Sequence, residues 1–173
     1  MAIKKILTEP DPFLRQKSIE VDRVDDGIRK LMNDMLDTMY DAPGIGLAAI
    51  QVGVPKRIIV IDLFKEQEKK PLYFVNPKII LKSNNNTSYE EGCLSVPGQF
   101  AEIDRPDRCH ISYLDYNGEN RELKSEGLLA TCIQHEIDHL EGILFIDYLS
   151  KLKKSFIVKK LSKQKKSLER IVV

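Results

Sequence analysis

The chain has 173 residues, of which 42% are hydrophobic and 31% are charged, as in an ordinary globular protein with one core. No apolar run approaches the length of a membrane-spanning helix, which is roughly 20 residues. No apolar segment typical of a signal peptide follows Met1. With three cysteines and no secretion signal, we expect reduced thiols and a cytoplasmic location. We also expect a monomer without membrane contact, folded as a single domain over residues 1–173.

The net charge of +1 conceals two regions of opposite sign. Residues 151–173 hold nine bases and one acid, a net charge of +8, whereas the other 150 residues hold 18 bases and 25 acids, a net charge of −7. A basic tail on an acidic body favours a polyanionic partner. A solvated, lysine-rich helix face without a partner is the alternative.

The first element in the chain is an amphipathic helix, predicted by apolar residues at steps of three and four over residues 28–39. Asp25 suits its start and Pro43 stops it. The regular methionine and leucine stripe of this helix indicates core packing. Beyond it, three segments rich in β-branched and aromatic residues predict short strands, at residues 57–63, 73–77 and 79–82.

A hairpin is predicted next, with strands over residues 109–116 and 119–123. Asn117 and Gly118 join them and suit a type I′ turn. A helix is then expected from a cap at Ser125 to about residue 140. One of its stripes faces the core and comprises Leu129, Ile133, Ile137 and Leu140, while the adjacent stripe comprises Leu128, Cys132, His135 and His139.

A last, basic helix is expected over residues 150–173, with the apolar residues of its first turns packed on the body. Strands and helices are segregated along the chain, without strict alternation. This order predicts an α+β fold. We expect short mixed or antiparallel strands packed around a central metal-binding helix, with an N-terminal amphipathic helix and a C-terminal helix.

The metal-binding character of the central helix follows from residues 135–139, which read HEIDH. Two histidines four residues apart lie on the same helix face, so both can reach one metal ion. Glu136 is placed to exchange protons with a water on that metal. The pattern favours a divalent-metal hydrolase.

A catalytic metal site normally takes three protein ligands, and the third is open to several candidates. Cys93 lies after Gly92 in a segment that ends at a proline, where a turn would expose its thiol. Cys132 lies within the helix and could equally be a small buried hydrophobic residue instead of a ligand. Cys109 and His110, on a predicted strand, are expected to be structural.

Residues 44–51 read GIGLAAIQ and match the glycine spacing of a dinucleotide-binding turn. That motif needs a strand before it and a helix after it. Here a helix comes first, and Pro55 prevents a following helix, so the nucleotide interpretation fails. Glycines instead let backbone approach a ligand closely, and the Gln51 amide could stabilise an oxyanion near a metal.

Three segments, GIGLAAIQ at 44–51, EGCLS at 91–95 and QHEIDHL at 134–140, closely resemble the three signature motifs of the peptide deformylase family. They occur in the order of that family, and the resemblance spans residues 7–149. The helical motif alone is shared by many metallohydrolases, whereas the trio is specific. The short chain with a C-terminal helix is similar to the bacterial type 1 branch.

The resemblance implies Cys93, His135 and His139 as ligands of one divalent metal ion per chain, with a water in the fourth position. Glu136 would be the general base and acid for that water. The side chain of Gln51 and the N–H of Leu94 would stabilise the oxyanion. The resemblance implies Fe²⁺ as the working ion, although a Cys-His-His set also accepts Zn²⁺, Ni²⁺ or Co²⁺.

The implied reaction removes the N-formyl group from the first methionine of nascent polypeptides and releases formate. Ile45, Leu128 and Cys132 would form the methionine pocket, with simple core packing as the alternative for each. Gly46 and Gly92 would let the peptide pair with the protein in an extended pose. Because the substrate emerges at the ribosome, the basic C-terminal helix is expected to dock there.

Two further residues bear on substrate and metal binding. Glu91 could orient a metal ligand or be an exposed acid. Phe100 stands where some members of the family carry an arginine that helps to hold the peptide, so peptide anchoring is expected to differ in detail.

Two other functions compete with this one. A metalloprotease would need a longer cleft and, in most cases, a Glu or His as third ligand. A structural metal site on an RNA-binding module would need four protein ligands, the fourth from Cys109 or Cys132.

Overall fold

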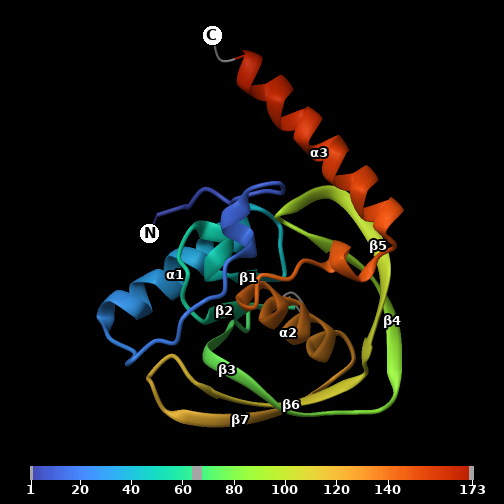
Figure 1. Ribbon diagram of the computed structural model, residues 1–173. Helices are drawn as coiled ribbons and strands as arrows, with labels where there is room; N and C mark the ends of the chain where they lie inside the picture. Colours follow the sequence, from blue (N-terminus) through green and yellow to red (C-terminus); the bar gives the residue numbers. More distant parts are fainter. Residues whose placement is uncertain (1, 64–67, 172–173) are drawn as a thin grey trace.

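The computed structural model describes residues 2–63 and 68–171, with side chains up to Ser167 (Figure 1). Its first long helix, α1 (Asp26–Asp41), confirms the prediction from the apolar spacing. The Asp25 carboxylate accepts a hydrogen bond from the N–H of Ile28 at 2.9 Å and so satisfies one of the free donors of the first turn. The methionine and leucine face of α1 is buried, as predicted.

A five-stranded antiparallel sheet forms the centre of the molecule, in the order β1-β2-β3-β6-β7. Its strands are β1 (Gly46–Ala48), β2 (Ile58–Ile61), β3 (Leu72–Lys82), β6 (Arg108–Leu114) and β7 (Asn120–Glu126). Successive residues of a strand point to opposite faces of a sheet. Accordingly, Ile58 and Val60 pack with α1, while Ile59 and Ile61 pack on the other face. Strand β2 is therefore apolar throughout, because both faces of the sheet are covered.

Strand β3 is continuous from Leu72 to Lys82, where the sequence predicted two strands. Asn76 lies at its centre with φ of 51°, and the pairing of β3 with β6 shifts register after Val75. The Asn76 side chain accepts a hydrogen bond from the N–H of Val21 and donates one to its C=O, both at 2.8 Å. A bulge therefore lies where the two predicted strands were separate, since asparagine tolerates positive φ.

The hairpin of β6 and β7 is confirmed, but its turn is not of type I′. That turn needs positive φ at both central residues. Among the described residues, Gly118 has φ of 82° whereas Asn117 is not in that region. The Asp115 carboxylate accepts hydrogen bonds from the N–H groups of Asn117 and Glu119 at 2.9 and 3.0 Å, and this loop is longer than the predicted one.

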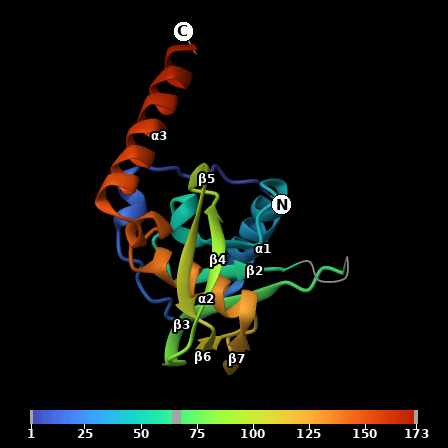
Figure 2. The same cartoon turned by 90° about the vertical axis from the view of Figure 1, so that its right-hand side faces the viewer.

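A second sheet, which the sequence did not predict, pairs β4 (Asn86–Cys93) with β5 (Val96–Pro106). Helix α2 (Gly127–Leu140) contacts both sheets, and Figure 2 shows β4 and β5 in front of it. On its other side, Ile133 and Ile137 pack with Ile59 and Phe74 of the central sheet. The α+β fold is confirmed, with α2 between the two sheets.

The predicted cap of α2 is wrong. The residue before the helix is Glu126, whose side chain makes no capping hydrogen bond. The Ser125 hydroxyl instead donates a hydrogen bond to the C=O of Cys109 at 3.1 Å. The serine therefore joins the end of β7 to β6.

Helix α3 (Lys151–Ile171) forms the C-terminal end and extends beyond the rest of the molecule (Figure 1). Ile157 and Leu161 are buried against the body. Leu152 and Phe156, in contrast, are 82% and 69% exposed, so only part of the apolar face packs as expected. Among the described residues, none of the helices is apolar over a length that would let it cross a membrane.

Candidate metal centre and substrate pocket

Among the buried polar side chains of helix α2 are His135, Glu136 and His139. One turn separates the two histidines, so both imidazoles reach the same side of the helix, where Cys93 meets them. The Cys93 sulfur lies 3.2 Å from Nε2 of His139. One potential ligand atom from each of Cys93, His135 and His139 lies within 4.8 Å of the other two.

Cys93 is the last residue of β4, and the short turn to β5 follows it. The Gln51 side chain also lies next to Cys93, with Nε2 3.5 Å from the Cys93 sulfur and 3.0 Å from the Ser95 hydroxyl. Its Oε1 accepts a hydrogen bond from the N–H of Ala48 at 2.8 Å. Gln51 is therefore held at both ends of its amide, next to the cysteine.

His135 is oriented by a buried carboxylate. Its Nδ1 lies 2.8 Å from Oε2 of Glu91, which leaves Nε2 free to face the other two side chains. Burial acts to raise the pKa of Glu91, but its hydrogen bonds with His135 and Arg105 outweigh that effect and the pKa is lowered. Of the two possibilities raised for Glu91, the structure shows a buried acid in contact with His135.

Arg105 connects this carboxylate to the far side of α2. Its guanidinium bonds both oxygens of Glu91, at 2.5 and 3.1 Å, and Oδ2 of Asp138 at 2.7 Å. The hydroxyl of Tyr148 donates to the same Asp138 oxygen at 2.7 Å. Arg105 was not identified from the sequence, because β5 was not predicted. This network fixes the position of His135 from behind.

Glu136 is 4% exposed, and its Oε2 has no hydrogen-bond partner among the described residues. Burial raises its pKa to about 7, although the nearby His135 acts to lower it. Gly46 lies against it, so close that a Cβ at Gly46 would sit 2.4 Å from Glu136 Oε1. A carboxyl group with a pKa near neutrality, at the wall of a pocket, suits proton transfer.

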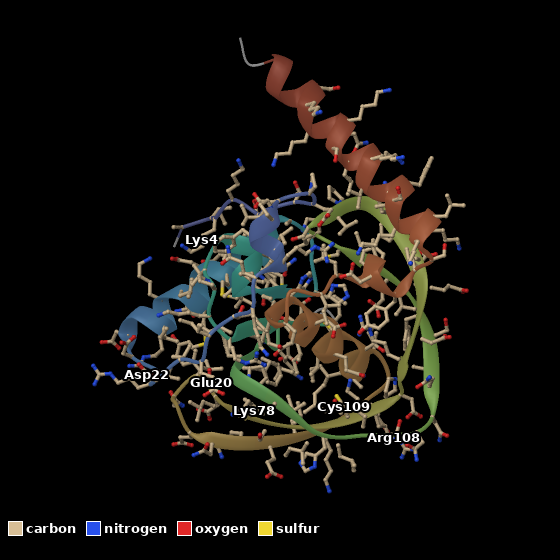
Figure 3. The ribbon with its side chains drawn as sticks, in the orientation of Figure 1. Lys4, Glu20, Asp22, Lys78, Arg108 and Cys109 are labelled. Carbon is tan, nitrogen blue, oxygen red and sulfur yellow. The ribbon has the colours of Figure 1, made fainter. Side chains whose placement is uncertain are left out.

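The donor set fits a divalent metal. One sulfur and two imidazole nitrogens suit zinc and other borderline transition metals, and a catalytic site with three protein ligands keeps a position for water. Cys109 lies apart on β6, where its sulfur is 3.2 Å from the Ser125 hydroxyl (Figure 3). Cys132 is buried beside Gly46 and does not belong to the group of three. The described residues thus offer no fourth ligand for a closed structural site.

Two of these three residues, Cys93 and His135, line a cavity of about 480 Å³. Gln51, Leu94 and Glu136 line this cavity with Cys93 and His135, and so do all five residues expected to bind substrate: Ile45, Gly46, Gly92, Leu128 and Cys132. Ile45 and Leu128 are 39% and 42% exposed, which excludes core packing for these two, whereas Cys132 is buried. Sequence reasoning missed the wall formed by β5, including Gly98 and Gln99, because it missed the strand.

Phe100 lies at the mouth of the cavity, with 65% of its surface exposed. Its ring covers Gly92, where an added Cβ would sit 2.5 Å from Cε1 of the ring. A side chain at position 92 would displace the ring from this contact. The aromatic ring thus forms an apolar rim in this chain.

Comparison with known proteins identifies the family and agrees with the fold. A family model described as polypeptide deformylase matches residues 3–155. The peptide deformylase of Pelagibacter ubique (strain HTCC1062) is 66% identical over 174 residues, which cover 100% of both chains. Among solved structures, the peptide deformylase from Ehrlichia chaffeensis in complex with actinonin is similar with a TM-score of 0.91 and 48% identity, over 95% of this chain and 98% of that chain. The protein described above therefore belongs to the peptide deformylase family of enzymes.

Proposed function

We propose that this enzyme removes the N-formyl group from the N-terminal methionine of nascent polypeptides and releases formate. The observation that carries this proposal is the group of Cys93, His135 and His139 next to Glu136, whose Oε2 has no hydrogen-bond partner among the described residues, with Cys93, His135 and Glu136 lining an open pocket. The family to which the chain belongs supports the substrate class.

Cys93, His135 and His139 would hold one divalent metal ion. When bound, such an ion supplies Lewis acidity, which polarises a carbonyl and makes water more acidic. Glu91 holds the proton on Nδ1 of His135, so that Nε2 keeps its lone pair for the metal. We propose Fe²⁺ as the working ion, with Zn²⁺, Ni²⁺ or Co²⁺ as substitutes. The mixed sulfur and nitrogen donors are compatible with each of these.

Glu136 would take a proton from the attacking water and deliver it to the amine that leaves. Its free oxygen and its pKa of about 7 support both transfers at neutral pH. The amide of Gln51 and the N–H of Leu94 would stabilise negative charge on the formyl oxygen. Gln51 suits this role because Ala48 and Ser95 hold its amide in place before substrate binds.

The methionine side chain would enter the apolar part of the pocket, formed by Ile45, Leu128 and Cys132. Gly46 of β1 and Gly92 of β4, which both line the pocket, would allow the peptide backbone to approach in an extended conformation. Phe100 at the rim would contact the following residues of the peptide by its ring.

The reaction is tested with formyl-Met-Ala-Ser and with its N-acetylated counterpart, as substrates for protein purified without oxygen. We expect stoichiometric formate and free Met-Ala-Ser from the first, and little turnover of the second, which is bulkier at the reacting carbon. A metalloprotease would instead cleave an internal bond of a longer blocked peptide. Such cleavage without formate release would overturn the proposal.

We further propose that α3 docks a cytoplasmic, monomeric enzyme on the ribosome. Support comes from the +8 charge of residues 151–173 and from the lysines of α3, most of which are exposed. Contacts between lysine and phosphate release counterions, so binding should weaken steeply as salt rises.

The test is co-sedimentation with ribosomes of a chain that lacks residues 164–173 and carries Lys153→Glu, Lys159→Glu and Lys160→Glu. We expect loss of co-sedimentation with formyl-Met-Ala-Ser still hydrolysed. Unchanged co-sedimentation would contradict docking by α3.

A further inference from the structure

A second hollow lies beside the first turns of α3, with a volume of about 770 Å³. Phe100 and Ala101 of β5 form one wall, and Leu152, Phe156 and Ile157 of α3 belong to the other. We call this hollow the α3–β5 groove. None of the proposed metal ligands or proton-transfer residues lines it.

The groove is unusual because large apolar side chains from two different elements stand exposed in it. Leu152 is 82% exposed, Phe156 is 69% exposed and Phe100 is 65% exposed. Their neighbour Ile157 is buried and fixes this part of α3 on the body. Exposed apolar side chains that gather in a hollow, rather than singly over a surface, mark a place where a ligand binds.

The groove continues the active-site pocket. Phe100 lines both hollows, and along β5 the preceding residues Gly98 and Gln99 line the pocket while the following residue Ala101 lines the groove. A polypeptide whose first residues are in the pocket has to leave it along one wall. One such wall is formed by β5, and it connects the pocket, at the Phe100 ring, with the residues of α3 that line the groove.

We propose that the α3–β5 groove binds the part of the substrate polypeptide that follows the residues held in the pocket, and that it favours apolar side chains there. This inference rests on the proposed function. The two charged residues of the groove, Glu102 and Lys153, carry opposite signs, so the groove offers no net charge by which to select an acidic or a basic segment. Its exposed apolar side chains gain most from an apolar one.

Contacts in the groove are remote from the formyl group and are the same before and during the reaction. They therefore lower KM and leave kcat unchanged. Partial burial of two apolar side chains corresponds to an increase in kcat/KM of about tenfold.

The experiment compares three substrates of the intact metal-loaded enzyme: formyl-Met-Ala-Ser, the same tripeptide extended by Gly-Leu-Phe-Leu, and the same tripeptide extended by Gly-Ser-Asn-Ser. We expect the apolar extension to lower KM about tenfold relative to the tripeptide, and the polar one to have little effect. The double variant Leu152→Ser, Phe156→Ser should lose the advantage of the apolar extension. The matched control is Ile80→Ser, Leu81→Ser, which alters two exposed apolar residues of β3 and should retain it.

Equal KM values for all three peptides in the unaltered enzyme would overturn the inference while the proposed function stands. An advantage of the apolar extension that survives in Leu152→Ser, Phe156→Ser would also overturn it. Absence of formate from the tripeptide would instead contradict the proposed function. Sedimentation velocity provides a further check, because a dimer that dissociates in the double variant would assign the groove to a second copy of the chain.

Discussion

Helices α2 and α3 represent two opposite ways in which this chain uses a helix. Ten of the 14 residues of α2 are buried, and its polar side chains meet partners from β4 and β5. Between Lys151 and Ser167 of α3, Ile157 and Leu161 are the buried residues, and the lysines are largely exposed. Reactive groups on α2 thus depend on exact neighbours far away in the chain. The contribution of α3 depends on the number and sign of its charges and on its exposed apolar residues.

The largest effect is expected for the proton-transfer residue of α2. Glu136→Gln keeps the size of the side chain but removes its ability to accept a proton. Turnover should fall by about 10²–10⁴ while the metal stays bound. The matched control is Glu126→Gln, an exposed carboxylate at the start of the same helix, which makes no capping bond and should leave kcat unchanged. Loss of metal together with activity in Glu136→Gln would show that Glu136 is a ligand instead.

We expect the buried ion pairs of Arg105 next to α2 to stabilise the fold more than exposed ion pairs do. Arg105→Met leaves Glu91, and to a lesser degree Asp138, without its positive partner inside the protein. The free energy of unfolding should fall by about 3–5 kcal/mol. Arg121→Met removes an equally well-formed but exposed set of ion pairs on β7, and its effect on the free energy of unfolding should be much smaller. Equal losses in the two variants, measured by urea unfolding, would contradict the contrast between buried and exposed charge.

Gly46 tests whether the pocket wall is fitted to Glu136. A Cβ at this position would sit 2.4 Å from Glu136 Oε1 and 3.0 Å from the Cys132 sulfur, so the carboxylate has to move. A displacement of about 1 Å at a reacting group typically lowers the rate about 10²-fold. We expect Gly46→Ala to bind metal normally and to lose kcat by that factor. A variant with normal kcat would mean that the carboxylate is free to move without consequence.

The smallest effect is expected at the junction of the two helices. Asp147 accepts a hydrogen bond from the N–H of Leu144 and forms ion pairs with Arg15 and Lys154. Burial acts to raise its pKa, but these partners outweigh it and hold the pKa below its usual range. A lowered pKa contributes stability above the unfolded value of about 4, which is lost as the pH falls through the folded value. Asp147→Asn should therefore lower stability at pH 7 by about 1 kcal/mol and by less near pH 2, as followed by thermal unfolding. A constant loss across this range would contradict the assignment.

The parts that could be predicted from the sequence are those with local signals. The cap at Asp25 and the apolar spacing define α1, and the histidine spacing defines the reactive face of α2. The spacing of the Met and Leu residues also predicted which face of α1 is buried. These features depend on residues that are close together in the chain.

The remaining features depend on pairing between distant segments. Strand β4 has a polar sequence, and β5 contains Gly98 and two prolines, so neither resembles a strand until the two pair with each other. The role of Arg105 could not be predicted without that pairing. The prediction that Ser125 caps α2 was wrong, because its hydroxyl instead donates a hydrogen bond to the carbonyl of Cys109 on the neighbouring strand.

The central claim is that Cys93, together with the two histidines of α2, holds a single divalent metal ion. Its most direct test is the metal content of protein purified without oxygen, measured by elemental analysis for Cys93→Ala and for Cys109→Ala. Both cysteines are free, but Cys93 lies with the histidines and Cys109 lies apart on β6. We predict one metal ion per chain in Cys109→Ala and a large loss of metal in Cys93→Ala. Full occupancy in Cys93→Ala, with full activity, would contradict the account.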